Sequence, residues 1–495
     1  MGCFIHVSNQ RKESQYMMLP VVNLAFSNIS VLLNMIFPLL IYPYLARVLG
    51  PENMGIYSYF GSIISYGMLI TSLGVGVYGV KKIGEYKDDD VKRKEVIADL
   101  IIINLIFAVM GFLAIIIAIL LESNANYLIP IIMSLQIVTS AISCEWYFVG
   151  VENQKYIVIR TFIAKILTLV LIFIFIKSRS DLITYVIIVA SITVAQHIYN
   201  YISLRRDERN INFHISKRII THIYYMLKTF LVEIMVRYFG LVDVIILGIL
   251  STKTNVAYYV LALNVFNSVV SVMKVSATTL LPRMAFYIFK KDEENIKGIL
   301  NKTSDMLYFI GIPATIFCYI WAKPIINLLG GSEFNSSVNA LQYLAILIIP
   351  SVITNMLVFQ FFYPNGNTKL LVIGYAISII VNVILNVILI PKMGFQSLTV
   401  ASFCSNIIVL ALMYCNNSKI AIYIFTKNTS KYVVVGIILL VIEIILNNYI
   451  TIYYLPIHLL ICLICYYFGL KLLREDSILP FVTVKLNKIF SRKAK

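Results

Sequence analysis

The sequence predicts an all-α polytopic membrane protein with fourteen transmembrane helices, of which twelve form two six-helix lobes and two follow at the C-terminus. Hydrophobic residues make up 60% of the 495 positions and charged residues only 13%, far from the balance of a soluble globular chain. Apolar runs of about 20 residues, each long enough to cross about 30 Å of hydrocarbon as a helix, follow one another from residue 21 to residue 473.

The predicted helices lie between a polar N-terminal segment and a basic C-terminal tail. The first fifteen residues are too polar for the core of a signal peptide, so we interpret residues 1–20 as a cytoplasmic lead. The predicted spans are approximately 21–44, 56–80, 96–121, 128–150, 156–176, 182–204, 224–250, 256–282, 305–329, 338–363, 370–390, 396–415, 432–448 and 450–473.

Basic residues determine the predicted orientation of the chain. The net charge of +17 would suit nucleic-acid binding, but 31 of the 41 Lys and Arg residues fall in the lead, the tail and alternate loops. The other loops hold only Arg47, Lys177, Arg179, Lys253 and Lys392. Because basic residues accumulate in cytoplasmic loops, both termini are predicted to be cytoplasmic, in the cell membrane. The charge therefore reflects topology, and no nucleic-acid partner is expected.

A short connector occurs twice. ENQKYIVI at 152–159 and GNTKLLVI at 366–373 share Asn, Lys, Val and Ile at a constant offset of 214 residues (366 − 152). A second pair of similar segments consists of LARVLGPENMGIY (45–57) and VIILGILSTKTNVAYY (244–259). The two repeats predict an N-lobe (21–204), a cytoplasmic linker (205–223) and a C-lobe (224–415), with the two lobes in the same orientation in the membrane. Two further helices (432–473) and a basic cytoplasmic tail (474–495) complete the predicted chain.

Polar residues line one face of several predicted helices. In the eighth helix the polar positions follow at steps of three and four residues, within about 80° of arc. Such stripes either line a cavity or serve as helix-packing contacts. The stripe of the eighth helix consists of Asn264, Asn267, Ser271, Lys274 and Thr278, and that of the first helix consists of Asn23, Ser27, Ser30 and Asn34.

Charged residues inside the predicted spans are stronger evidence for a cavity. Lys165, Glu233, Arg237, Asp243 and Lys274 each lie within an apolar run. A central charge that faces lipid costs about 2.5–3.5 kcal/mol, so these groups must face protein or water. The alternative is a set of buried ion pairs. Glu233 and Arg237 are spaced for one pair, and Glu145, near the inner end of the fourth predicted helix, could reach Lys165 to form another.

No enzyme or cofactor is predicted. The sequence contains no nucleotide-binding loop, no metal-ligand set and no nucleophile with a partner base. Cys462 and Cys465 form a CxxC on the last predicted helix, where packing is the favoured role.

Several motifs resemble the polysaccharide biosynthesis family of Wzx-type flippases, whose superfamily also holds multidrug extruders and the lipid II flippase. The resemblance implies a V-shaped carrier of two lobes that moves an undecaprenyl-diphosphate-linked oligosaccharide to the outer leaflet by alternating access. The motifs are LARVLGPENMGIYSYFGSI, GVKKIGEYKDDD, WYFVGVENQKY, Asp243 before ILG, and LGGSEF.

The resemblance also assigns roles to candidate residues. A cationic cavity would bind the diphosphate through Lys165, Arg237 and Lys274, and polar residues such as Asn34, Asn264, Asn267 and Ser271 would bind sugar hydroxyls. Position 379, which matches Lys165 in the repeat, is Ile, so the second lobe lacks the equivalent cation. Asp243 and Glu233 are the candidates for a coupling carboxylate that uses a proton or sodium.

Other functions stay open at this stage. They are a lipid II flippase, a multidrug extruder of the same superfamily and a scaffold of a polysaccharide assembly complex that transports nothing. The expected partners are membrane lipid, the lipid-linked substrate, and a polysaccharide polymerase with its glycosyltransferases.

Overall fold

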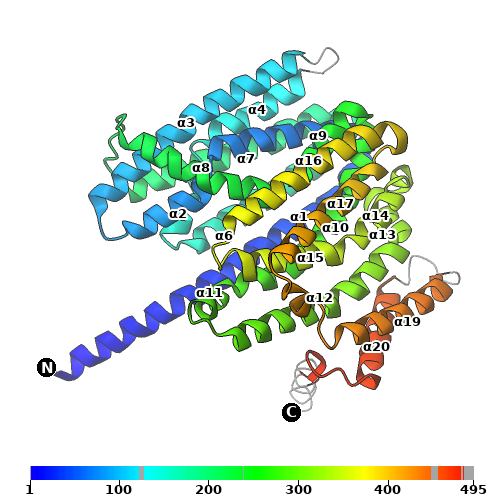
Figure 1. The fold of residues 1–495 in the computed structure, drawn as a ribbon. Coiled ribbons are helices and arrows are strands. Elements are labelled where there is room, and N and C mark those ends of the chain that lie inside the picture. The colour runs from blue at the N-terminus through cyan, green and yellow to red at the C-terminus, as the bar shows by residue number, and fades with distance from the viewer. Residues whose placement is uncertain (1, 122–126, 238, 448–454, 481–482, 484–495) are drawn as a thin grey trace. The chain divides into compact units, whose positions relative to one another are not determined.

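The computed structural model describes residues 2–121, 127–237, 239–447, 455–480 and 483. Every regular element in these residues is helical, which confirms the all-α prediction (Figure 1). Eight of the described helices are long and apolar enough to cross a membrane, or nine if one pair bent by 43° forms a single span. The count of fourteen stays a prediction.

The chain divides into two compact units. Unit 1 is Met1–Leu241 and unit 2 is Val242–Lys495. The division falls inside the predicted span 224–250 and not in the predicted linker 205–223. The reason is that the helix following this linker packs on two helices of unit 1.

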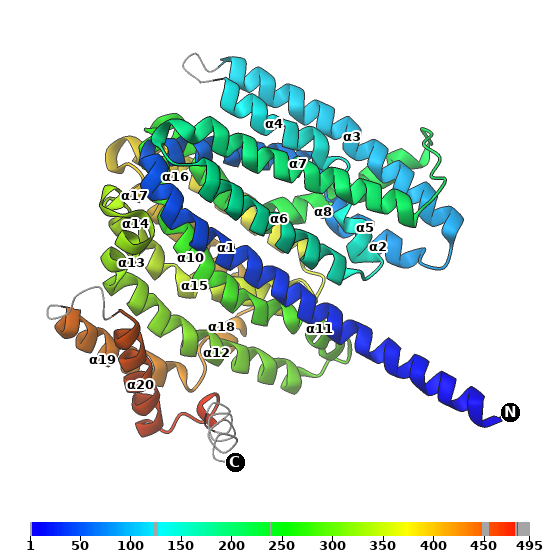
Figure 2. The same cartoon turned by 180° about the vertical axis from the view of Figure 1, so that it is seen from behind.

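Unit 1 contains eight α-helices and the start of a ninth. Within it α1 packs on α3, α4 and α6, and α6 and α7 lie side by side (Figure 2). The elements are α1 (Gly2–Ser72), α2 (Val75–Glu85), α3 (Asp90–Leu121), α4 (Leu128–Ser140), α5 (Glu145–Gly150), α6 (Gln154–Phe175), η1 (Arg179–Asp181), α7 (Leu182–Asp207), α8 (Arg218–Arg237) and the first part of α9 (Phe239–Leu250).

α1 covers the predicted lead, the first predicted span and most of the second. The segment interpreted as a lead is helical from Gly2, since residues 3–19 contain no Gly or Pro to interrupt a helix. Gly50, with φ 77° and ψ 171°, breaks the helix where the sequence predicts an outer turn. This break separates the two predicted spans.

A second break separates α1 from α2. Leu73 and Gly74 both have positive φ, 38° and 77°. A side chain on Gly74 would place its Cβ 2.6 Å from Thr229 Oγ1 on α8, and the Thr229 hydroxyl donates to the Gly74 carbonyl at 3.2 Å. The predicted span 56–80 therefore ends early, and α2 starts in a new direction.

The core of unit 1 joins α2, α3, α5 and α8. Ile83, Leu100, Trp146, Phe148 and Met226 are all buried in this cluster. The cluster explains why α8 belongs to unit 1, because one face of α8 completes its apolar core.

A polar network surrounds this core. Arg93 Nε on α3 donates to Glu208 Oε1 at 2.5 Å, just beyond the end of α7. Asp99 on α3 lies 3.3 Å from Arg218 and 3.5 Å from His222 on α8. These contacts attach both ends of the predicted linker 205–223 to α3.

Unit 2 contains the remaining helices. Its core joins α10, α12, α15, α19 and α20. α14 and α15 form the bent pair, and α16 and α17 pack along each other. The elements after α9 are α10 (Lys253–Thr279), α11 (Leu281–Phe289), α12 (Glu293–Ile320), α13 (Ala322–Gly330), η2 (Ser332–Phe334), α14 (Ser337–Ile346), α15 (Ile348–Leu357), η3 (Val358–Phe362), α16 (Thr368–Met393), α17 (Gln396–Asn416), α18 (Ile420–Ile424), α19 (Thr429–Asn447) and α20 (Leu455–Leu472).

The repeated connector has the same backbone geometry in both units. Glu152 and Gly366, which are 214 residues apart (366 − 152), have φ of 61° and 75°. Three backbone hydrogen bonds of 2.8 to 3.2 Å recur at the same offset. In the first copy, the backbone N–H groups of Val151, Glu152 and Asn153 donate to the carbonyls of Tyr147, Val149 and Phe148. In the second copy, those of Asn365, Gly366 and Asn367 donate to the carbonyls of Phe361, Tyr363 and Phe362.

Candidate functional site

The candidate residues of unit 1 lie on α1 and α6. Lys165 is half-buried near the middle of α6, and its Nζ lies 5.3 Å from the centre of the Phe37 ring on α1. Asn34 is exposed one turn before Phe37, so it points to the same side of α1. Lys165 has no carboxylate partner among the described residues; its one recorded charge contact is with an aromatic ring.

Glu145 does not pair with Lys165. It lies at the start of α5, and its Oε1 is 3.5 Å from Arg160 Nη2. Arg160 lies five residues before Lys165 on α6, more than one helical turn nearer to the connector. The expected pair is therefore corrected to Glu145 with Arg160.

The polar stripe of the eighth predicted helix lies on α10. This helix is continuous from Lys253 to Thr279, so residues at steps of three and four share one face. Asn267 is exposed, and Asn264, Ser271 and Lys274 are half-buried. Lys274 has no ion pair or hydrogen-bond partner in the part of the chain that the structure describes.

Two further candidates cannot be placed in this way. Glu233 and Arg237 lie on the backbone of α8, but their side chains are outside the described residues. Their proposed pairing stays a prediction.

Asp243 lies in a buried polar cluster of unit 2. Its side chain is 1% exposed, although it lies on an apolar stretch of α9. Asn386 on α16 donates to its Oδ1 at 2.8 Å, and Ser402 on α17 donates to its Oδ2 at 3.2 Å. Asn386 also donates to Asn382 Oδ1 at 3.0 Å. The carboxylate is thus held by donors from two helices, α16 and α17.

The cluster contains two buried polar atoms without a partner. Asn386 Oδ1, an acceptor, and Asn382 Nδ2, a donor, have no hydrogen-bond partner among the described residues. Of the two, only the oxygen is a possible ligand for a cation. A carboxylate with amide and hydroxyl oxygens is a set of hard ligands that suits an alkali cation, and the carboxylate alone can take a proton. The described residues contain no group of three or more His, Cys, Asp or Glu side chains arranged to hold a metal.

Part of this cluster escaped the sequence analysis. No sequence pattern assigns a role to Asn382, Asn386 or Ser402. Asn382 and Asn386 are spaced four residues apart inside an apolar run, which is a signal for a shared polar face. Their distance from Asp243 in the sequence hides the contact.

Comparisons with known proteins agree with this architecture. Residues 21–288 match the family described as polysaccharide biosynthesis protein, and residues 229–388 match MatE. A protein of Escherichia coli K12 named "Putative O-antigen transporter" is 21% identical over 401 residues, which cover 79% of this chain and 95% of that protein. The "probable low-salt glycan biosynthesis flippase" of Haloferax volcanii is 26% identical over 34% of this chain and 35% of its own.

Two solved structures share the fold. The lipid II flippase MurJ in its inward closed conformation superposes with a TM-score of 0.73 at 16% identity, over 92% of this chain and 99% of that chain. An inward-facing multidrug resistance MATE family transporter gives a TM-score of 0.61 at 13% identity, over 78% and 94% of the two chains.

The described residues are all helical, many of these helices are apolar enough to span a membrane, and the matched family and relatives are transporters; together these findings define a multi-pass membrane transporter. The chain belongs to the polysaccharide biosynthesis protein family, with the family match covering residues 21–288.

Proposed function

We propose that this protein is a flippase that moves an undecaprenyl-diphosphate-linked oligosaccharide repeat unit from the inner to the outer leaflet of the cytoplasmic membrane. The names of the Escherichia coli and Haloferax volcanii relatives support transport of a lipid-linked glycan. The observation that carries the proposal is that two half-buried lysines on apolar helices, Lys165 and Lys274, have no carboxylate partner among the described residues.

Lys165, Arg237 and Lys274 bind the diphosphate in this mechanism. A cation inside an apolar helix is costly unless it meets a negative charge or water, and a diphosphate supplies two or more negative charges. Asn34, Asn264, Asn267 and Ser271 bind sugar hydroxyls by donating and accepting hydrogen bonds. The two lobes open alternately to the two sides of the membrane, so the headgroup crosses without entering hydrocarbon.

Asp243 supplies the coupling site. A proton or sodium bound at its carboxylate would change the charge of a buried group held by α16 and α17. Moving one charge across 100 mV is worth about 2.3 kcal/mol, which is sufficient to bias a conformational equilibrium.

The proposed setting is the assembly of capsule, O-antigen or exopolysaccharide. Both termini are cytoplasmic in this proposal, and a polysaccharide polymerase and glycosyltransferases act before and after the flippase. The lipid II flippase and the multidrug extruder are alternative outcomes of the test below.

The test replaces the proposed diphosphate ligands one at a time. Lys274→Ala and Arg237→Ala should reach the membrane at normal levels, stop delivery of polymer to the cell surface and cause lipid-linked units to accumulate. Lys274→Arg should keep part of the activity, because the charge remains while its geometry changes. Lys323→Ala is the control, since this exposed lysine lies on α13 and outside the proposed cavity.

Full surface polymer in both alanine variants, in a strain without another flippase, would refute the cationic cavity and favour a scaffold. Rescue of cells depleted of their lipid II flippase would instead assign the peptidoglycan precursor as substrate. Drug efflux without polymer delivery would assign the extruder function.

A further inference from the structure

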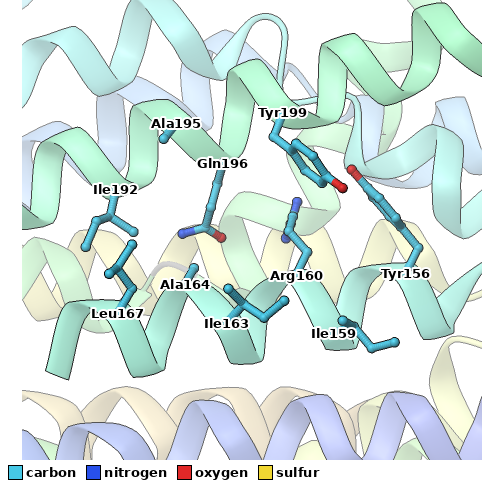
Figure 3. A pocket seen from close by; sticks show the side chains of 10 residues that line it. All are labelled: Tyr156, Ile159, Arg160, Ile163, Ala164, Leu167, Ile192, Ala195, Gln196 and Tyr199. Atoms are coloured by element: carbon cyan, nitrogen blue, oxygen red, sulfur yellow. The ribbon is translucent and has the colours of Figure 1, made fainter. Parts of the chain in front are cut away.

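A groove runs between α6 and α7 in unit 1 (Figure 3). Its volume is about 340 Å³, within the range of small ligand sites. Most of its walls are apolar, while Arg160, Gln196 and two tyrosines gather toward one end. Its lining residues are Tyr156, Ile159, Arg160, Ile163, Ala164, Leu167, Ile192, Ala195, Gln196 and Tyr199.

The apolar part of the groove is exposed. Ile159, Ile163 and Leu167 have 46%, 59% and 47% of their surface exposed, although they follow each other along one face of α6. A continuous apolar surface of this kind is unfavourable in water and is well suited to a hydrocarbon chain. The walls therefore favour a lipid chain as the occupant.

Arg160 lies at the polar end and has unused hydrogen-bonding capacity. Its side chain is only 10% exposed. Nη2 lies 3.5 Å from Glu145 and 3.2 Å from Thr161 Oγ1, and Nε is buried without a partner among the described residues. Figure 3 shows the guanidinium between α6 and α7, beside Gln196 and Tyr199. A buried guanidinium with an unpaired N–H favours an anionic oxygen as its ligand.

The tyrosines fit the same position. The rings of Tyr156 and Tyr199 stack with their centres 6.0 Å apart. The Tyr156 hydroxyl donates to Asn200 Oδ1 at 3.1 Å and lies 3.0 Å from Ser203 Oγ, so it points into a polar region. Tyrosines collect where hydrocarbon meets lipid headgroups. The connector 151–153 that precedes α6 is predicted to be cytoplasmic, which places this end of the groove at the inner leaflet.

We propose that the α6/α7 groove binds an anionic membrane phospholipid. Its acyl chain lies along Ile163 and Leu167, and its phosphate accepts hydrogen bonds from Arg160. Glu145 already lies beside the Arg160 guanidinium, so the net charge of the site is about +1 or less. A monoanionic phosphodiester matches this charge better than a diphosphate does. The site is therefore distinct from the proposed diphosphate ligands, and it does not depend on the transported substrate.

Native mass spectrometry of the purified full-length protein tests the proposal. The protein is equilibrated with phosphatidylglycerol or with phosphatidylcholine of identical acyl chains. The wild type should retain phosphatidylglycerol at least about tenfold more strongly, as one charge-assisted hydrogen bond implies. Arg160→Gln should lose this preference while keeping a polar side chain of similar reach.

Two further variants distinguish lipid binding in the groove from nonspecific attraction to the basic surface. Lys155→Gln removes an exposed cation five residues earlier on α6 and should keep the preference. Ala195→Trp fills the groove without touching Arg160 and should abolish retention, so it also carries the test if Arg160→Gln does not fold.

Three results would overturn the proposal. One is equal retention of the two lipids by the wild type, and another is a preference that survives both Arg160→Gln and Ala195→Trp. The third is displacement of phosphatidylglycerol by an equimolar polyprenyl monophosphate, which would assign the groove to the carrier lipid. Because the readout is lipid retention, these results are independent of polymer delivery and leave the proposed function to its own test.

Discussion

Asn386 Nδ2 donates to Asp243 Oδ1 at 2.8 Å, and this bond joins α16 to α9 across 143 positions of the sequence. Both side chains are buried, with at most 1% of their surface exposed. A carboxylate in this position is held in one orientation by neutral donors, with no basic residue among its recorded hydrogen-bond partners. It is the carboxylate to which the proposed function assigns the coupling proton or sodium.

Asp243→Asn should abolish ion-driven transport, because it removes the charge but keeps the size of the side chain. Asn386→Ala should lower the affinity for the coupling ion by about tenfold, as is usual for a group that orients an ion ligand. Uptake into proteoliposomes under an imposed proton or sodium gradient measures both effects. Asn406→Ala is the matched control, since this amide lies one turn beyond Ser402 on α17 and donates to the Ser402 carbonyl, not to Asp243. Unchanged gradient dependence in Asp243→Asn would exclude the site.

Glu208→Ala should destabilise unit 1. The side chain of Arg93, which is 15% exposed, would lose its partner at 2.5 Å and would keep only exposed Asp90 and the Lys87 carbonyl as partners. Breaking a buried pair by removing one member costs about 3 kcal/mol. Thermal unfolding in detergent measures the loss. Glu85→Ala serves as the comparison, because its pair with Lys82 is largely exposed and is worth about 1 kcal/mol or less. Equal melting temperatures for the two variants would contradict the prediction.

Acidification should destabilise the end of unit 1 that contains His222. This residue precedes the predicted span 224–250, and burial lowers its pKa below the ordinary 6.5, although Asp99 opposes the shift. The unfolded chain therefore binds a proton more readily than the folded chain does. Stability should be complete above pH 6.5 and should fall as the pH drops through the folded-state pKa.

Thermal unfolding between pH 8 and pH 5 tests this slope. His222→Gln should flatten it near pH 6, whereas His214→Gln should leave it unchanged, because His214 is exposed in the connector before α8. A slope that persists in His222→Gln would assign the pH dependence to other groups.

Single-cysteine labelling tests the predicted orientation. The 31 basic residues in one set of loops and tails, against five in the other, predict which side each connector faces. Labelling from the wrong side at Asp89 or Glu293 would refute the fourteen-helix topology. Probes at Asp89, Asn210, Glu293 and Asn417 should react only from inside, and those at Asn53, Asn124, Thr254 and Asn335 from outside; Asn124 lies outside the described residues.

Hydrophobic patterning was sufficient to predict the helical class, because length and apolarity are properties of each segment alone. It did not predict the breaks at Gly74 and Cys144, where positive φ interrupts a continuous apolar run. At Gly74 the cause is the close approach of Thr229, which is 155 residues away and is invisible to a local pattern.

The candidate site divides in the same way. The free-energy cost of placing a charge in the membrane identified Lys165, Lys274 and Asp243 as residues that must face protein or water. This cost depends only on the position of the residue in a span. It did not identify the partners. Glu145 was assigned to Lys165 from its place along the chain, yet it reaches Arg160, since a partner depends on which faces of the helices meet.

The division between the units has a mechanical consequence. The two units are contiguous in sequence, so the polypeptide crosses from one to the other once, between Leu241 and Val242. Asp243 is separated from this covalent joint by one residue. The joint lies inside the continuous helix α9 (Phe239–Leu250), so Asp243 stands on the same helix that carries the chain from one unit into the other. Under the proposed function, a change of charge at Asp243 would therefore act on the connecting helix itself.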